Sequence, residues 1–176
     1  MADKKFINKT NYTKSLYYTM SVYNNTKGKN YYLIIVFVTL AFYGAIRSIK
    51  LTNNLVLFYV YTTLGLLAIP TFMFIIPSIS SKINYKKLME ETEGRELINT
   101  IEISDRVYSK NSLGVLTNHT FDKITTMSQY RKLFVFTFND KSVLYMDIDG
   151  FKTGNIEELK EYLSTKTSVK VKIEAK

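Results

Sequence analysis

Cysteine is absent from this chain of 176 residues, and histidine occurs once, at His119. The missing cysteines exclude disulfides, thiolate metal sites and cysteine nucleophiles. The sequence also contains no glycine-rich phosphate loop, no serine nucleophile elbow and no paired metal-binding motif. We therefore expect neither an enzyme nor a bound cofactor, and we assign no catalytic, cofactor-binding or metal-binding residues.

The few residues that could carry chemistry have simpler interpretations. His119 lies in a predicted strand with no partner pattern near it, which favours a surface or half-buried histidine over a catalytic one. Asp147 and Asp149 lack the spaced oxygens and the terminal glutamate of a calcium loop, so they predict a turn. Asp105 and Asp140 also fall at predicted turns, where short carboxylates bond to their own backbone.

Charged residues are also missing from two long apolar runs, residues 31–46 and 55–79. A helix needs ~20 mostly apolar residues to span a bilayer, because its backbone must be hydrogen-bonded within the segment. The second run has this length, and the first reaches it if residues 47–49 are included. We therefore predict two transmembrane spans, at about 31–49 and 55–79.

Basic residues predict how these spans are oriented. Five lysines lie outside the two spans, whereas the turn between the spans holds Arg47 and Lys50; the five are Lys27, Lys29, Lys82, Lys86 and Lys87. Positive charge concentrates on the cytoplasmic side, so we expect a multi-pass protein of the cell membrane with both termini in the cytoplasm. Residues 1–30 carry six lysines and one acid, which favours anionic headgroups as their partner over nucleic acid.

The chain as a whole divides into four parts. Residues 1–30 are a basic, tyrosine-rich arm that is partly helical, and its tyrosines lie either at the membrane interface or against the soluble domain. Residues 31–80 form the transmembrane hairpin, and 81–96 form a connecting helix that ends near Gly94. Residues 97–176 form a cytoplasmic domain.

The cytoplasmic domain is predicted to be a small antiparallel sheet. Short alternating runs separated by polar turns predict six strands, at 100–104, 107–110, 115–121, 124–130, 133–138 and 142–148. A helix follows, capped by Asn155 with Glu158 in the capping-box position. The tail 167–176 is either an added edge strand of this sheet, which we favour, or a strand that completes a neighbour's sheet. The fold class is α+β, with a two-helix hairpin before a sheet domain of the pleckstrin-homology pattern.

The whole arrangement resembles the YcxB-like membrane proteins of Gram-positive bacteria. The resemblance rests on the strand-turn-strand ISDRVYSKNSLG, the segment LFVFTFND and the F-K-x-G-x-x-E-E-L-K-x-Y-L pattern of residues 151–163. Family members often carry Trp where Phe121 stands, and a Pro-Lys pair before the last helix. The resemblance implies a membrane location and a pleckstrin-homology-like domain. It implies no reaction.

Two functions remain open. In the first, the hairpin holds the domain at the cytoplasmic face, where it binds a protein; phosphoinositides are less favoured, because Arg131 and Lys132 are the only adjacent basic pair in the strand turns. In the second, a small accessory or immunity-type protein acts through its hairpin. Gly44, Gly65 and the kinking prolines Pro70 and Pro77 would then shape an interface with another membrane protein.

Overall fold

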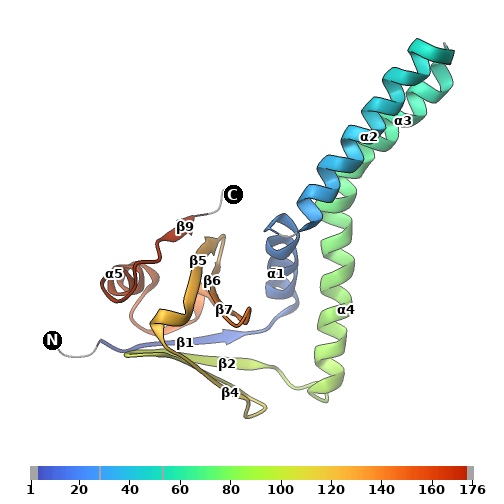
Figure 1. The fold of residues 1–176 in the computed structure, drawn as a ribbon. Coiled ribbons are helices and arrows are strands. Elements are labelled where there is room, and N and C mark those ends of the chain that lie inside the picture. Colours follow the sequence, from blue (N-terminus) through green and yellow to red (C-terminus); the bar gives the residue numbers. More distant parts are fainter. Residues whose placement is uncertain (1–3, 28, 53, 174–176) are drawn as a thin grey trace. The chain divides into compact units, whose positions relative to one another are not determined.

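The computed structural model describes residues 4–27, 29–52 and 54–173. The chain divides into two compact units, one formed by Met1–Tyr17 with Tyr85–Lys176 and the other by Tyr18–Asn84. We call the first the sheet unit and the second the helical unit. The architecture is α+β, as the sequence predicted, with two long apolar helices in one unit and mostly antiparallel strands in the other (Figure 1).

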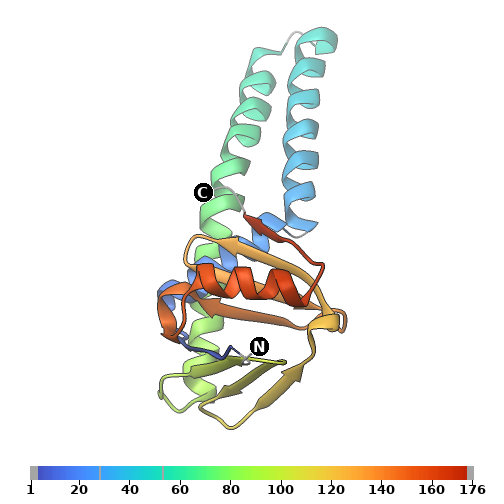
Figure 2. The same ribbon diagram turned by 90° about the vertical axis from the view of Figure 1, so that its left-hand side faces the viewer.

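The helical unit is built from two long helices. The first is α2 (Lys29–Thr52), preceded by α1 (Lys14–Lys27); the second consists of α3 (Leu55–Pro70), the π-helical turn η1 (Thr71–Ile75) and α4 (Ile76–Glu91). Helices α2 and α3 run side by side in opposite directions (Figure 2). Two stretches are long and apolar enough to cross a membrane, Tyr32–Leu51 and Leu55–Glu91, with mean hydropathies of 1.9 and 1.8 in their most apolar windows.

Small residues allow α2 and α3 to approach closely. The buried positions between them are Ala41, Ala45, Ser48, Gly65 and Ala68. A Cβ atom added at Gly65 would lie 3.2 Å from Cβ of Ala41, and one added at Gly44 would lie 3.2 Å from the Tyr61 ring. Close packing through small residues is typical of membrane helices. Both glycines that were predicted to shape an interface with another protein are therefore used inside the hairpin itself.

The second long helix differs from its prediction, which ended the span near residue 79 and placed a separate helix at 81–96. The structure has no interruption there, and the helix continues to Glu91. None of the polar residues that follow Pro77 breaks a helix. The predicted stop near Gly94 is confirmed: Gly94 has φ of 79°, and its N–H donates to the Met89 carbonyl at 2.7 Å.

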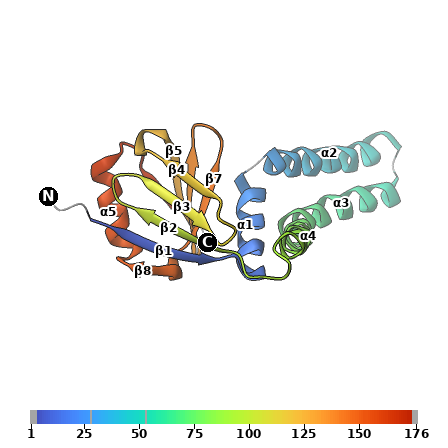
Figure 3. The same cartoon turned by 90° about the horizontal axis from the view of Figure 1, so that it is seen from below.

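The sheet unit contains two sheets. Sheet A has the strand order β4-β3-β2-β1-β8 (Figure 3). Sheet B has the order β7-β6-β5-β9. The strands are β1 (Phe6–Asn11), β2 (Ile98–Ile103), β3 (Val107–Asn111), β4 (Leu116–His119), β5 (Ile124–Tyr130), β6 (Leu133–Phe138), β7 (Val143–Asp147), β8 (Phe151–Thr153) and β9 (Val171–Ile173). The six strands that the sequence predicted correspond to β2 through β7.

Strand β1 was not predicted, because residues 1–30 were interpreted as an arm. It pairs antiparallel with β2 over six residues, from Phe6 opposite Ile103 to Asn11 opposite Ile98, and pairs with β8 on its other side. The helical unit is therefore inserted between two neighbouring strands of one sheet. Gly154, which follows β8, has φ of 77° and leaves room for Phe6, whose ring would lie 2.5 Å from an added Cβ.

A buried polar link joins β1 to sheet B. The side chains of Asn8 and Thr10 are 1% and 0% exposed. Asn8 Nδ2 donates to the Asp147 carbonyl at 2.7 Å, and Thr10 Oγ1 donates to Asn8 Oδ1 at 2.8 Å while accepting from the Asp147 N–H at 2.9 Å. Every polar atom in this chain of bonds therefore has a partner, which removes most of the cost of burying it.

The core of the sheet unit is aromatic. Strand β6 supplies Phe134, Phe136 and Phe138, all at most 2% exposed, and lies in the interior of sheet B. Helix α5 (Ile156–Lys166) covers this core with buried Leu159 and Leu163. Its predicted cap is confirmed, because Asn155 Oδ1 accepts from the Glu158 N–H at 2.9 Å.

Part of the tail joins its own sheet. Strand β9 pairs with β5, Met127 lying opposite Val171, and the pairing is parallel. The favoured interpretation of the tail as an added edge strand is thus correct for residues 171–173. The last part of the predicted tail, 174–176, lies outside the described residues.

Candidate interaction surface

The residues weighed for catalysis or metal binding have structural partners. The His119 ring stacks on Phe138, with centroids 3.9 Å apart and planes 15° apart. The Asp140 carboxylate accepts from the Ser142 N–H at 2.8 Å and from its hydroxyl at 2.6 Å, and these bonds lower the pKa of Asp140. Among the described residues, no group of three histidine or carboxylate side chains could hold a metal ion.

The carboxylates before α5 also belong to a turn. Asp147 Oδ1 accepts from the Asp149 N–H at 3.1 Å at the start of η3 (Ile148–Gly150). Asp149 pairs with Lys132 at 2.5 Å, and this hydrogen bond raises the pKa of Lys132. Arg131 lies over the Tyr130 ring, 5.3 Å from its centroid. Both members of the basic pair in the turn between β5 and β6 thus contact side chains of their own domain.

A cluster of exposed apolar side chains lies in the sheet unit at the turn between β3 and β4 and the first residue of β4. Leu113, Val115 and Leu116 are 52%, 57% and 62% exposed. We call these three residues the apolar tip. Soluble domains bury most large aliphatic side chains, and a cluster of exposed ones marks a surface that another molecule covers.

The backbone of the apolar tip is fixed by Asn111. Its Oδ1 accepts from the N–H groups of Leu113 and Val115, at 3.1 and 2.9 Å, and Gly114 completes the turn with φ of 85°. The tip is also tied to β2, because the Ser112 N–H donates to the Ile98 carbonyl at 2.8 Å. The three apolar side chains are therefore held outward by an ordered turn, which lowers the entropy lost on binding.

Strand β4, which begins at Leu116 of the apolar tip, is the last strand of sheet A, so in the described residues its outer edge has no neighbouring strand. An edge of this kind offers backbone N–H and C=O groups to a further strand. Leu116 lies opposite Lys110 in the register of β3 and β4. This edge of the sheet therefore combines a strand with no neighbour on one side, exposed apolar side chains and the positive charge of Lys110.

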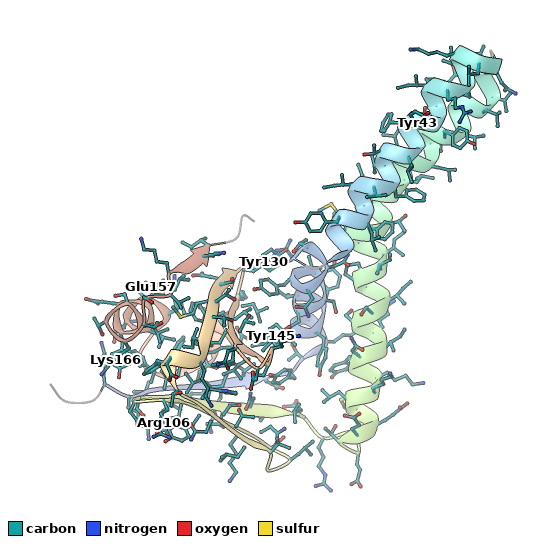
Figure 4. All side chains as sticks on the ribbon, viewed as in Figure 1. Tyr43, Arg106, Tyr130, Tyr145, Glu157 and Lys166 are labelled. Carbon is teal, nitrogen blue, oxygen red and sulfur yellow. The ribbon has the colours of Figure 1, made fainter. Side chains whose placement is uncertain are left out.

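The helical unit presents a second apolar surface. Large side chains stand exposed along both helices, Tyr43 at 61%, Val56 at 71% and Leu66 at 58% among them (Figure 4). This surface follows the full length of the two helices, unlike the compact apolar tip. It is of the kind that lipid chains cover.

The first lysines of the predicted amino-terminal arm form ion pairs within the sheet unit. Lys4 pairs with Glu158 at 2.8 Å and Lys5 with Glu102 at 2.7 Å, both inside the sheet unit. The Tyr17 ring contacts the Tyr12 and Tyr85 rings, with centroids 5.9 and 5.8 Å away, and all three tyrosines belong to the sheet unit. Burial raises the pKa of Tyr12. The side chains of Lys27 and Lys29, which entered the orientation prediction, lie outside the described ones.

Comparison with known proteins gives no match: no family model, no curated protein and no solved structure aligns with the chain. The arguments for function therefore rest on the surfaces just described. Sequence analysis missed the apolar tip, because it assigned Ser112 to Gly114 to a turn. The signal was the run Leu113-Gly-Val-Leu116, which is unusually apolar for a connection between two strands.

Proposed function

We propose that this chain is a membrane-anchored, non-catalytic binding protein. In this proposal α2 and the helix from α3 to α4 cross the bilayer as a hairpin, and the sheet unit binds a protein partner at the cytoplasmic face. The apolar tip beside the open edge of β4 is the observation that carries the proposal. The exposed apolar side chains of the helical unit support the membrane anchor.

The proposal includes the resemblance to YcxB-like proteins and a pleckstrin-homology-like sheet unit. Two sheets followed by one covering helix, α5, support it. One feature departs from the expected plan: β1 precedes the hairpin, so the domain is assembled from both ends of the chain.

The pairing of β1 with β2 supports a hairpin over a single span. Asn11 and Ile98 are register partners in one sheet, so both ends of the inserted helical segment lie on the same side of any membrane that it enters. This requires an even number of crossings, which two helices provide. The cytoplasmic side is favoured by the lysines that flank the spans.

We take the partner segment to be an extended, apolar chain that adds as a strand to β4. Strand addition uses the backbone groups of the edge, and alternate side chains of the added strand would contact Leu116 and its neighbours. Lys110 favours an acidic residue in the segment. Headgroup phosphates are a weaker choice, because Lys132 already pairs with Asp149.

Membrane insertion and orientation can be tested by cysteine labelling, since the chain has no cysteine of its own. Leu51→Cys lies near the turn of the hairpin and Leu113→Cys lies in the apolar tip. An impermeant maleimide should label Leu51→Cys on intact cells and label Leu113→Cys only after lysis. Labelling of Leu113→Cys on intact cells would show that the chain has the opposite orientation.

The binding surface can be tested in the full chain by charge. Leu116→Asp should abolish crosslinking to the partner in native membranes, whereas Val143→Asp should preserve it. Val143 is a matched control, because it is 42% exposed and lies on β7, an edge strand of the other sheet. Equal crosslinking by both variants would remove the β4 edge from the proposal.

A further inference from the structure

The hydrogen bonding of the second long helix changes between its two prolines. Ile76 N–H donates to the Thr71 carbonyl, five residues back, which is the pattern of a π helix. Continuing that pattern by one residue would pair residue 77 with the Phe72 carbonyl. Residue 77 is proline and has no N–H to give.

The Phe72 carbonyl therefore loses both of its regular helical donors. In an α helix its donor would be the Ile76 N–H, which is used by Thr71. In a π helix its donor would be residue 77. An unpaired carbonyl is costly wherever water is excluded, and on the proposed function, on which this inference rests, the hairpin lies in the bilayer.

A side chain from another helix takes the place of the missing donor. Asn25 of α1 donates from Nδ2 to the Phe72 carbonyl at 2.5 Å, and its side chain is only 7% exposed. Both residues belong to the helical unit. A cavity of about 330 Å³ adjoins this contact and is lined by Asn25, Ile69 and Met73 among others, so the turn has room to change its winding.

We propose that Asn25 holds the long helix in its π-helical form by satisfying the carbonyl that Pro77 leaves without a donor. Without this bond the π-helical turn is no longer stabilised relative to a regular α helix, and the segment relaxes toward the α-helical form. Such a change shifts the winding of α4 against α3 by one residue. The bond between Asn25 and Phe72 is thus a conformational lock within the helical unit, beyond any role in partner binding.

The test is a double-substitution experiment on the full chain in detergent micelles. Spin labels at Val60→Cys on α3 and Ile83→Cys on α4 report the distance across the turn, and both parent side chains are about half exposed, at 47% and 51%. Asn25→Ala should displace the distance distribution, changing the ratio of the two forms by about tenfold or more, as expected when a buried acceptor loses its donor.

Pro77→Ala supplies the decisive comparison. It restores an N–H at residue 77, so Asn25→Ala should have little or no effect in that background. Pro70→Ala is the matched control, because an N–H at residue 70 faces the carbonyl of residue 66 and not that of Phe72. Asn24→Ala controls for the loss of an amide from an exposed position on α1.

Each outcome decides the proposal. Dependence of the Asn25→Ala effect on Pro77 but not on Pro70 supports the lock. An effect of equal size in all three backgrounds shows that Asn25 acts through some other contact, and an unchanged distance in Asn25→Ala shows that the bond does not hold the turn.

Discussion

Removing β1 should unfold the sheet unit. A fragment of residues 97–176 contains every strand that follows the helices, and from the sequence alone it would be chosen as the soluble domain. In the structure it lacks the strand between β2 and β8. Sheet A of the fragment would be split, and β8 would have no neighbour.

The loss is comparable to the stability of a whole domain. Phe6 is 1% exposed, and deleting a buried phenylalanine side chain costs about 3–5 kcal/mol. The side-chain bonds of Asn8 and Thr10 and the backbone bonds between β1 and β2 would also be lost. Each of these hydrogen bonds contributes about 1 kcal/mol to the free energy of unfolding. Domains of this size are stable by only about 5–15 kcal/mol. We therefore expect the fragment to be unfolded or molten.

A rejoined chain provides the matched control. The Tyr12 N–H donates to the Leu97 carbonyl at 3.0 Å, so a short Asn-Gly turn can connect Tyr12 to Leu97 in place of residues 13–96 and join β1 and β2 as a hairpin. The rejoined chain should unfold cooperatively in urea, followed by circular dichroism, and give a dispersed NMR spectrum. Cooperative unfolding of 97–176 at the same urea midpoint would refute the central role of β1.

Three further substitutions test separate contacts. Thr10→Val should destabilise the sheet unit by about 1–3 kcal/mol in urea titrations, because the buried Asp147 N–H loses its acceptor; an unchanged midpoint would contradict this. Lys4→Gln should raise the pKa of Glu158 toward its ordinary value in an NMR titration, since the bond from Lys4 is the main cause that lowers it. The stability that this ion pair contributes is present above the ordinary carboxylate pKa and is lost as the pH falls through the lowered pKa. The free energy of unfolding of the variant should therefore depend less on pH in the acid range. Gly65→Leu should weaken the hairpin by about 1–3 kcal/mol through overpacking, and equal stability in micelles would show that the helices are not closely packed there.

The strands that could be predicted are those whose partners are near in the sequence. β2 through β7 follow one another with short turns, and β6 is an almost continuous apolar run, LFVFTF. β1 has no such signal: its inward positions are Phe6, Asn8 and Thr10, so two of three are polar. They are buried only because Asp147 bonds to them. That contact spans most of the chain and leaves no local pattern.

The candidate sites could not be predicted from the sequence for a similar reason. An apolar run such as Leu113 to Leu116 reads equally as core or surface, and only the position of β4 at the edge of its sheet decides between them. The two prolines did predict an irregular helix. Which carbonyl they leave without a donor, and that Asn25 supplies one, depends on the contact between two helices.

The insertion of the helical unit between β1 and β2 sets an order for synthesis. β1 leaves the ribosome first, and its partner β2 follows only after the entire helical segment, on the order of ten seconds later at ordinary rates of translation. During that interval β1 is a single strand without a sheet. Its composition suits the delay, because Phe6 and Ile7 are its only apolar residues and two lysines precede it. The sheet unit can close only when the helical segment between β1 and β2 has been made, so a folded sheet unit reports that both long helices have already been synthesised.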